Sequence, residues 1–393
     1  MSDPIVIVAA ARTPMGDFLG ALSSLPAPQL GAHAVRAVLE RSGIAPDTVS
    51  EVFMGCVLPA GTGQAPARQA AKAAGLPDAV GATTVNKVCG SGMKAIMLAH
   101  DVIAAGSADV VVAGGMESMS NAPHLLAKGR TGMKMGDVKL ADHMMLDGLE
   151  DAYERGRPMG DFGEAVVQAY QFTRADQDKY AGESLAWAQG AIAAGDFGAE
   201  IAPVSVPSRK GDVLVSDDEH PGRVSVEKLP GLKPAFRADG TITAASSSAI
   251  ADGAAALLLM RQSRARELGL PVLATLVAHA APAQEPAWFA TAPIPAIRKV
   301  LAKAGWSVDE VDLFEINEAF AVVAMAAARD LGIARDRLNI GGGACALGHP
   351  IGASGARVVV TLLHALMRTG GRRGVASLCI GGGEATALAI ELV

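Results

Sequence analysis

Short apolar runs alternate with longer stretches in which apolar residues recur at helical spacing, and this alternation occupies both ends of the chain. Apolar runs of strand length without an alternating polar face are typical of strands that are buried on both sides. The pattern therefore predicts an α/β protein whose sheets are covered by helices. The expected strands are residues 5–9, 52–57, 109–113, 254–260, 272–278, 311–316, 375–380 and 385–392, and the expected helices are residues 28–41, 90–105, 295–304, 318–330 and 353–368.

The two ends of the chain resemble each other, whereas the middle differs from both. Ser91-Gly92 opens an expected helix that leads to Gly114, and Ser354-Gly355 opens one that leads to Gly381. The separations are close but unequal, 23 residues (91 to 114) and 27 residues (354 to 381). We interpret this as an internal duplication, with chance similarity between glycine-rich βα units as the alternative. Residues 118–249 are rich in methionine, glycine and charge, and we expect them to form an inserted, loop-rich region.

Composition and charge exclude several classes of protein. The 393 residues are 50% hydrophobic and 19% charged, which excludes a disordered chain, and the 45 glycines lack the period of collagen. A net charge of −6 disfavours a general nucleic-acid or anionic-membrane surface. We see no membrane helix and no signal peptide, and the four cysteines form no C-x-x-C pair, so a disulfide framework or zinc site is not expected. These features favour a reduced, cytoplasmic enzyme.

The first candidate for chemistry is Cys89 in the run Cys89-Gly90-Ser91-Gly92. A cysteine at a helix N-terminus meets free backbone N–H groups and the positive end of the helix dipole, which favour the thiolate. We therefore expect a nucleophile, with N–H groups nearby that could hold an oxyanion. A buried cysteine at a tight turn is the alternative.

Two further candidates are a histidine and a second cysteine, each set among glycines. His349 lies between Gly348 and Pro350, on a loop rather than a helix face, and is placed to act as a base or hydrogen-bond donor. Cys379 ends an expected strand, where open α/β sheets build their sites, and its thiol could exchange a proton if its pKa is tuned toward neutrality. Both residues could instead be structural.

Asn317 follows the strand expected at residues 311–316. Its side chain either caps the next helix or orients a water molecule in the site.

Taken together, these segments resemble the signatures of the thiolase family. The matching segments are Cys89-Gly90-Ser91-Gly92, Gly114-Gly115-Met116-Glu117-Ser118-Met119-Ser120, Asn317-Glu318-Ala319-Phe320, Gly348-His349-Pro350-Ile351-Gly352-Ala353-Ser354-Gly355 and Cys379-Ile380-Gly381-Gly382-Gly383, in order along nearly the whole chain. The resemblance implies a duplicated five-layer αβαβα thiolase fold. Its N-terminal half would comprise residues 1–118 and 249–269, its inserted loop domain residues 119–248, and its C-terminal half residues 270–393.

The resemblance also implies a reaction and a role for each catalytic residue. Cys89 would take an acyl group as a thioester while His349 accepts its proton, and Cys379 would take the α-proton of a second acetyl-CoA. His349 and a water held by Asn317 would form one oxyanion hole, and the N–H groups of Cys89 and Gly381 the other. No metal or organic cofactor is implied, since coenzyme A belongs to the substrate.

Substrate contacts and assembly are implied in the same way. The residues expected to contact acyl-CoA are Leu149, Met159, Ala235, Phe236, Ser248, Ala319 and Phe320. Phe289 stands where the family often has a methionine in the acyl pocket, which favours a short acyl chain, and Arg223 could replace an arginine that the family places at Gly222. The basic stretch from Lys128 to Lys139 resembles a cationic tetramerisation loop, so a homotetramer is expected, with a solvated basic loop as the alternative.

Within this family the sequence favours an acetyl-CoA C-acetyltransferase, which joins two acetyl-CoA molecules into acetoacetyl-CoA and coenzyme A. A 3-oxoacyl-CoA thiolase of longer chain length is the near alternative. A carrier-protein condensing enzyme normally pairs one cysteine with two histidines, so Cys379 argues against it. A non-catalytic acyl-CoA-binding relative should lack at least one catalytic side chain. This chain has all four, namely Cys89, Asn317, His349 and Cys379.

Overall fold

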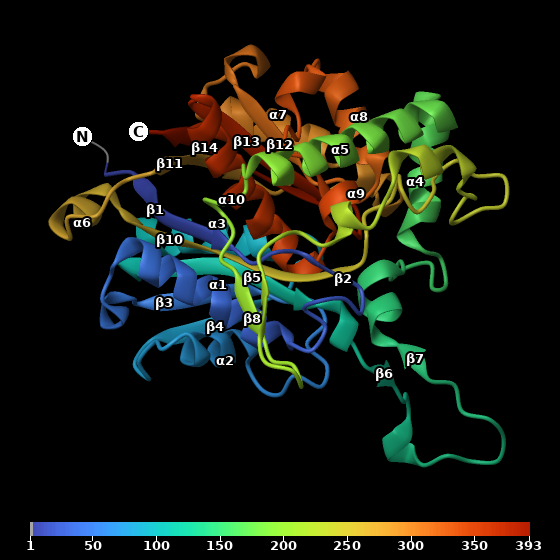
Figure 1. The fold of residues 1–393 in the computed structure, drawn as a ribbon, viewed down its shortest axis with the longest axis horizontal. Coiled ribbons are helices and arrows are strands. Elements are labelled where there is room, and N and C mark those ends of the chain that lie inside the picture. Colours follow the sequence, from blue (N-terminus) through green and yellow to red (C-terminus); the bar gives the residue numbers. More distant parts are fainter. Residues whose placement is uncertain (1–2) are drawn as a thin grey trace.

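The computed structural model describes residues 3–393 and contains two sets of strands that share one arrangement (Figure 1). The strands lie in the order β12-β13-β14-β11-β1-β10-β5-β3-β4, with β2 paired to β10. In each set the first pair is parallel (β3 with β5, β12 with β13) and the next two are antiparallel (β5-β10-β1, β13-β14-β11). This repeated order and pairing sense supports the duplication that the sequence predicts.

The bounds of the strands match the expected runs in most places. The strands are β1 (Ile5–Arg12), β2 (Gly16–Asp17), β3 (Glu51–Gly55), β4 (Gly81–Val85), β5 (Val110–Ser118), β6 (His124–Leu125), β7 (Ala141–Asp142), β8 (Val204–Val206), β9 (Val213–Val215), β10 (Ala251–Arg261), β11 (Ala274–Ala280), β12 (Leu313–Ile316), β13 (Arg373–Ile380) and β14 (Glu384–Leu392).

Helices cover both outer faces of the strands and fill the space between the two sets. The helices are α1 (Ala27–Ser42), α2 (Pro66–Ala73), α3 (Ser91–Ala104), α4 (Met159–Tyr170), α5 (Arg174–Ala194), α6 (Gln262–Glu267), α7 (Pro293–Ala304), α8 (Ala321–Leu331), α9 (Ala344–Leu347) and α10 (Ile351–Thr369). α1 and α2 pack on one outer face, α7 and α8 on the other, and α3 and α10 lie in the centre. The result is the five-layer αβαβα architecture that the family resemblance implies.

The two central helices cross at a pair of glycines that are equivalent in the duplication. A Cβ atom added at Gly92 of α3 would lie 2.7 Å from the backbone nitrogen of Ala356, and one added at Gly355 of α10 would overlap the backbone nitrogen of Met93. Neither obstacle is a flexible side-chain end, so only glycine permits this approach. Because Cys89 precedes α3 and His349 precedes α10, the crossing sets the relative position of the two residues.

The inserted region is less loop-like than expected. It contains the two long helices α4 and α5, so the expectation of a loop-rich segment is wrong for residues 159–194. The apolar residues of α5 are spread around the helix rather than gathered on one face, which removes the periodicity signal. Its start nevertheless carries a capping box formed by Thr173 and Asp176, a local signal that could have indicated the helix.

The segment between β6 and β7 projects from the body of the protein (Figure 1). All of residues 126–140 are exposed. Within residues 3–393, none of the helices combines the length and apolar character needed to cross a lipid bilayer.

Candidate active site

Three of the expected catalytic residues line one small cavity beneath the central helices. Cys89 precedes the N-cap residue of α3, His349 precedes the N-cap residue of α10, and Gly381 lies immediately after β13. The cavity, here called the inner cavity, has a volume of about 50 Å³. It is lined by Val88, Cys89, Gly148, Leu149, Met159, Ser248, Phe289, Ala319, Phe320, His349, Ile351 and Gly381.

Backbone N–H groups surround the thiol of Cys89. The amides of Gly381 and of Cys89 itself both hydrogen-bond to its sulfur, which lowers its pKa. Burial has a larger effect than these hydrogen bonds, and the negative charge of Glu117 acts in the same direction as burial. The two together raise the pKa of Cys89 to about 11. The expectation that the helix N-terminus yields a resting thiolate is therefore wrong, because desolvation is the larger effect. Cys89 needs a base.

His349 is held as a neutral base in one tautomer. Its Nδ1 lies 2.6 Å from Oγ of Ser354, whose hydroxyl donates to the carbonyl oxygen of Pro350 at 2.9 Å. A hydroxyl has one hydrogen, so Ser354 accepts at the histidine and Nδ1 carries the proton. Nε2 is then unprotonated, and its lone pair faces only the long contact with Nδ2 of Asn317 at 3.5 Å. Burial, with the positive charge of Arg357, lowers the pKa of His349 to about 3, so the ring is neutral near pH 7.

Asn317 reaches the same imidazole and does not cap a helix. α8 begins at Ala321, and its N-cap residue is Phe320, so the capping alternative is wrong. The Nδ2 of Asn317 lies 3.5 Å from Nε2 of His349, and its Oδ1 accepts from Arg357 at 3.3 Å. The contact with Arg357 fixes which end of the amide faces the histidine.

Sequence reasoning missed the ion pair that supports Asn317. Arg357 also donates to Oε1 of Glu315 at 2.7 Å, and both side chains are almost fully buried. A glutamate inside an apolar strand and an arginine inside an apolar helix are the available signals, since buried charges occur in pairs. The role of Ser354 depends on its distance from His349, which the sequence does not show.

Cys379 lies beside Cys89 at the end of β13. Burial raises the pKa of Cys379 well above its ordinary value, and the neighbouring Cys89 raises it further, because two thiolates repel each other. Both effects act against the tuning toward neutrality under which the sequence would let Cys379 exchange a proton. The raised pKa of each residue favours the protonated thiol in both places.

Glu117 connects the loops around the site. Its carboxylate accepts from the backbone amides of Val57 at 2.9 Å, Leu58 at 3.1 Å and Gly352 at 2.9 Å. Burial nevertheless raises the pKa of Glu117 to about 7. The residue lies in β5, within the segment Gly114–Ser120 noted in the sequence, and it ties the turn after β3 to the start of α10.

A larger cavity opens outside the inner one and shares several of its residues. This outer cavity has a volume of about 240 Å³. It is lined by Met119, Met145, Leu149, Pro158, Met159, Gly160, Phe236, Ser247, Ser248, Ala249, Ile250, Ala319, Phe320 and His349. Six of the expected substrate residues thus border it: Leu149, Met159, Phe236, Ser248, Ala319 and Phe320.

The remaining expected contacts lie in other places. Phe289 is buried and borders the inner cavity. Ala235 is exposed and Arg223 pairs with Glu219 and Asp17, and neither residue lines the two cavities. Their contacts with substrate stay predictions.

Comparisons with known proteins agree over the full length of the chain. Residues 5–263 match the thiolase N-terminal domain and residues 270–392 the thiolase C-terminal domain. The chain is 51% identical to an acetyl-CoA acetyltransferase of Cupriavidus necator, covering 98% of this chain and 99% of that protein. It is 50% identical to the cytosolic acetyl-CoA acetyltransferase of Rattus norvegicus, covering 99% and 98%.

Solved structures show the same likeness. The acetyl-CoA acetyltransferase of Bacillus anthracis superposes with a TM-score of 0.97 at 41% identity, covering 100% of this chain and 99% of that one. The Acat5 thiolase of Ascaris suum, in complex with coenzyme A, has a TM-score of 0.94 at 42% identity, covering 99% and 100%.

Proposed function

This chain belongs to the thiolase family, and we propose that within it the protein is an acetyl-CoA C-acetyltransferase. The reaction joins two acetyl-CoA molecules into acetoacetyl-CoA and coenzyme A, and it is reversible. The observation that carries the proposal is the inner cavity, which is lined by Cys89, by His349 with its unprotonated Nε2 and by Gly381. Relatives of about 50% identity over the full length that are named acetyl-CoA acetyltransferase support it.

In the first half of the reaction Cys89 takes an acetyl group. Nε2 of His349 accepts the thiol proton as the sulfur attacks the thioester carbonyl, and the oxyanion is held by the N–H groups of Cys89 and Gly381. One such donor contributes roughly 3–4 kcal/mol to a transition state. The carbon–sulfur bond to coenzyme A breaks, and the leaving thiolate takes the proton of Cys379. Cys89 is then a thioester, His349 an imidazolium and Cys379 a thiolate.

In the second half Cys379 removes a proton from the methyl group of a second acetyl-CoA. The imidazolium of His349, with a water oriented by Asn317, stabilises the enolate oxygen. The carbanion attacks the thioester on Cys89, a carbon–carbon bond forms, and the Cys89 sulfur leaves and regains its proton from His349. All three residues return to their starting protonation states, so no outside proton is consumed.

The proximity of the two thiols gives the reaction an order. A charge on Cys89 disfavours a charge on Cys379. The thiolate of Cys379 therefore forms while the sulfur of Cys89 is uncharged, as it is once Cys89 is a thioester.

Chain length is the test of the proposal. Two buried aromatic side chains, Phe289 and Phe320, border the small inner cavity, and their ring centroids are 6.4 Å apart. We expect kcat/KM for thiolysis to be higher with acetoacetyl-CoA than with a medium-chain 3-oxoacyl-CoA. A clear preference for the longer substrate would assign the protein to the 3-oxoacyl-CoA thiolases instead.

The two thiols can be tested separately. The Cys89→Ala variant should form no acetyl-enzyme, as detected by mass spectrometry of the intact protein with acetyl-CoA. The Cys379→Ala variant should still be acetylated yet fail to exchange the acetyl methyl protons with deuterium from solvent. Loss of acetylation in both variants would contradict this division of roles.

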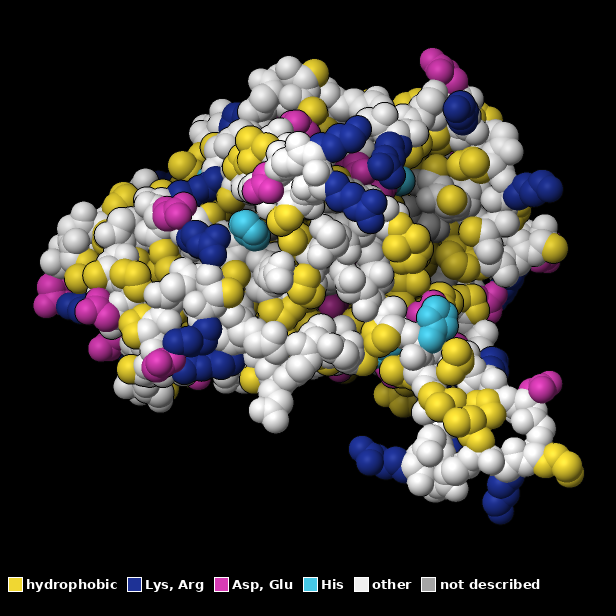
Figure 2. All heavy atoms as spheres, turned by 60° about the horizontal axis from the view of Figure 1, so that its bottom comes forward, with side chains coloured by type: hydrophobic (Ala, Val, Ile, Leu, Met, Phe, Trp, Pro, Cys, Tyr) yellow, Lys and Arg dark blue, Asp and Glu magenta, His cyan; other side chains and the backbone are white. Residues whose placement is uncertain are grey.

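We propose a homotetramer in which the projecting segment, residues 126–140, contacts other copies of the chain. It exposes five large apolar side chains, namely Leu126, Met133, Met135, Val138 and Leu140. Figure 2 shows hydrophobic side chains on this projection with lysine and arginine at its rim. The basic residues Lys128, Arg130, Lys134 and Lys139 are exposed and suit the phosphates of coenzyme A.

Deletion of the projection tests its role in assembly. Replacement of residues 128–139 by a short glycine-serine linker should reduce the mass in solution, measured by light scattering, from a tetramer to a dimer. An unchanged tetramer would refute the assignment. We also propose a cytoplasmic location, supported by the rodent relatives that are named cytosolic.

A further inference from the structure

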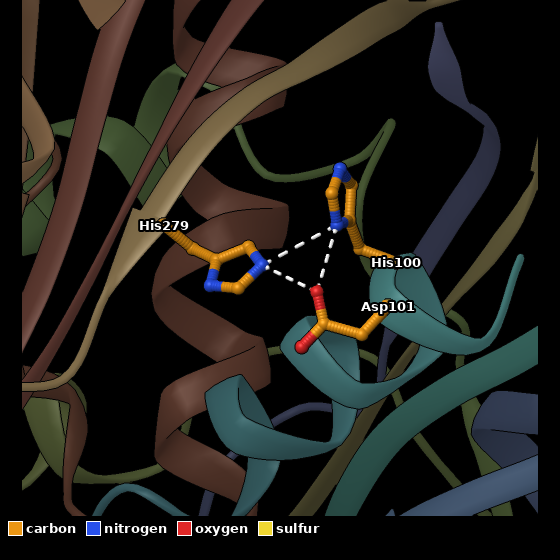
Figure 3. Close-up of side chains that lie close together, drawn as sticks. All are labelled: His100, Asp101 and His279. Carbon is orange, nitrogen blue, oxygen red and sulfur yellow. Dashed lines mark hydrogen bonds and ion pairs between the residues drawn. The ribbon is translucent and has the colours of Figure 1, made fainter. Parts of the chain in front are cut away.

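Two histidines and an aspartate meet at a point between α3 and β11, away from the catalytic residues (Figure 3). His100 and Asp101 are neighbours near the C-terminal end of α3, and His279 lies on β11. α3 begins at Ser91, so His100 is about 14 Å along the helix from the end that carries Cys89. The mechanism uses none of the three residues.

A β-bulge brings His279 to this point. The register of β11 against β14 shifts between Leu276 and Ala278. Before the shift, Leu276 packs in the central core with α3, and after it Ala278 packs in the outer core. The next residue, His279, therefore points inward toward α3 (Figure 3).

The three ligand-type atoms are mutual neighbours. Oδ1 of Asp101 lies 3.1 Å from Nδ1 of His100 and 3.0 Å from Nε2 of His279. The two nitrogens are 3.3 Å apart. The imidazole planes are at 81° to each other, and one nitrogen of each ring faces the same carboxylate oxygen (Figure 3).

Protons satisfy only two of these three contacts. If each neutral ring donates its hydrogen to Oδ1 of Asp101, the third contact brings two N–H donors together at 3.3 Å. If one nitrogen loses its hydrogen to accept from the other, its lone pair faces the carboxylate. A cation bound to all three atoms removes this conflict, because each atom then offers a lone pair to the same centre.

The spacing of the atoms fits such a cation. A triangle with sides of 3.0, 3.1 and 3.3 Å has its three corners about 1.8 Å from its centre. An ion about 1 Å above its plane would lie about 2.1 Å from each atom, which is the length of zinc–nitrogen and zinc–oxygen bonds.

Two imidazoles and one carboxylate select for late first-row divalent metals over Mg²⁺ or Ca²⁺, which prefer oxygen ligands.

The surroundings leave the site accessible. The side chains of His100, Asp101 and His279 are 23%, 51% and 16% exposed, so an ion can enter and water can complete its coordination. The nearby ammonium group of Lys303 donates to the backbone oxygen of His279 at 2.9 Å and is thereby engaged.

We propose that His100, Asp101 and His279 bind one divalent transition-metal ion of the Zn²⁺ class, which links α3 of the N-terminal half to β11 of the C-terminal half. The site is separate from the reaction, and its ion acts as a structural link. The sequence predicts no zinc site, because that prediction rests on the spacing of the cysteines. The proposed site contains no cysteine.

The test compares metal binding in the purified enzyme with that in three variants. His279→Ala and Asp101→Asn each remove one ligand, and the second keeps the size of the side chain. His33→Ala removes a histidine of α1 outside the cluster and is the control. With Zn²⁺ in calorimetry, the wild type and His33→Ala should bind one more ion per chain than His279→Ala, and Asp101→Asn should bind at least tenfold more weakly. Zn²⁺ should raise the thermal midpoint of the wild type and of His33→Ala only.

A second measurement distinguishes this site from the thiols. Co²⁺ should produce d–d bands without a thiolate charge-transfer band in the wild type, and these bands should disappear in His279→Ala. A charge-transfer band would place the ion on a cysteine and overturn the proposal. Equal binding by all variants, or no binding by the wild type at micromolar Zn²⁺, would overturn it as well.

Discussion

Ser354→Ala tests how the protein keeps Nε2 of His349 available as a base. The serine hydroxyl accepts from Nδ1 of His349 at 2.6 Å and donates to the carbonyl oxygen of Pro350. That carbonyl also accepts from the backbone amides of Ala353 and Ser354, so it keeps partners in the variant. The substitution therefore acts mainly on the imidazole.

The expected magnitude follows from the two states left to the ring. With the proton on Nδ1, a buried N–H lacks a partner, which costs about 1–3 kcal/mol. With the proton on Nε2, the lone pair that should accept the Cys89 proton is gone, and the N–H faces the donor Nδ2 of Asn317 at 3.5 Å. Since 1.4 kcal/mol corresponds to a tenfold change, we expect acetylation of Cys89 to be about 5-fold to 150-fold slower.

The assay is rapid-quench mass spectrometry of the acetyl-enzyme formed from acetyl-CoA. Thr369→Ala removes a hydroxyl from the exposed end of the same helix, where it donates only to the carbonyl oxygen of Ala365, and serves as the control. Urea unfolding of both variants separates a loss of folded protein from a slower step. If folded Ser354→Ala is acetylated at the wild-type rate, the tautomer argument is refuted.

Three further predictions concern the surroundings of the site. Because the pKa of His349 is lowered to about 3, the ring stays unprotonated above that pH, so the acetylation rate should show no fall near pH 6.5, where an ordinary histidine would titrate; a fall there would contradict a buried neutral base. Gly355→Ala should lower the free energy of unfolding by about 1–3 kcal/mol or more in urea titrations, since its Cβ would overlap the backbone of Met93; an unchanged midpoint would show that the helices can separate freely. Arg357→Met leaves Glu315 buried without its partner and should lower that free energy by about 3–5 kcal/mol, whereas the double variant with Glu315→Leu should recover much of the loss; no recovery would place the damage elsewhere.

Local signals in the sequence predicted most of the strands and the helices that flank them. β1, β13 and β14 are continuous apolar runs buried on both faces, and a pattern of that kind needs no tertiary information to be recognised. The sequence did not indicate β4, because Gly81–Val85 mixes small and polar residues instead of forming an apolar run, and it lies at the edge of the sheet. α5 was missed because it lacks an apolar face.

Some features of the candidate site could also be predicted from the sequence, and others could not. The motifs around Cys89, His349 and Cys379 are short and rich in glycine, and their resemblance to the thiolase signatures implies which side chains carry the chemistry. The sequence did not indicate their charges, since the pKa of Cys89 depends on burial that segments far along the chain create. Nor could it indicate that Arg357 and Glu315, which are 42 residues apart, support Asn317.

By itself the sequence indicated the α/β alternation and the duplication, because these depend on periodicity and on recurring local motifs, and its resemblance to the thiolases implied the reacting groups. Only the tertiary structure decided that both thiols rest protonated, that His349 holds its proton on Nδ1, and that His279 faces His100 across 179 residues of chain. The physical reason is that desolvation, hydrogen-bond partners and the direction of a side chain after a bulge are set by contacts between distant segments, which local patterns do not encode.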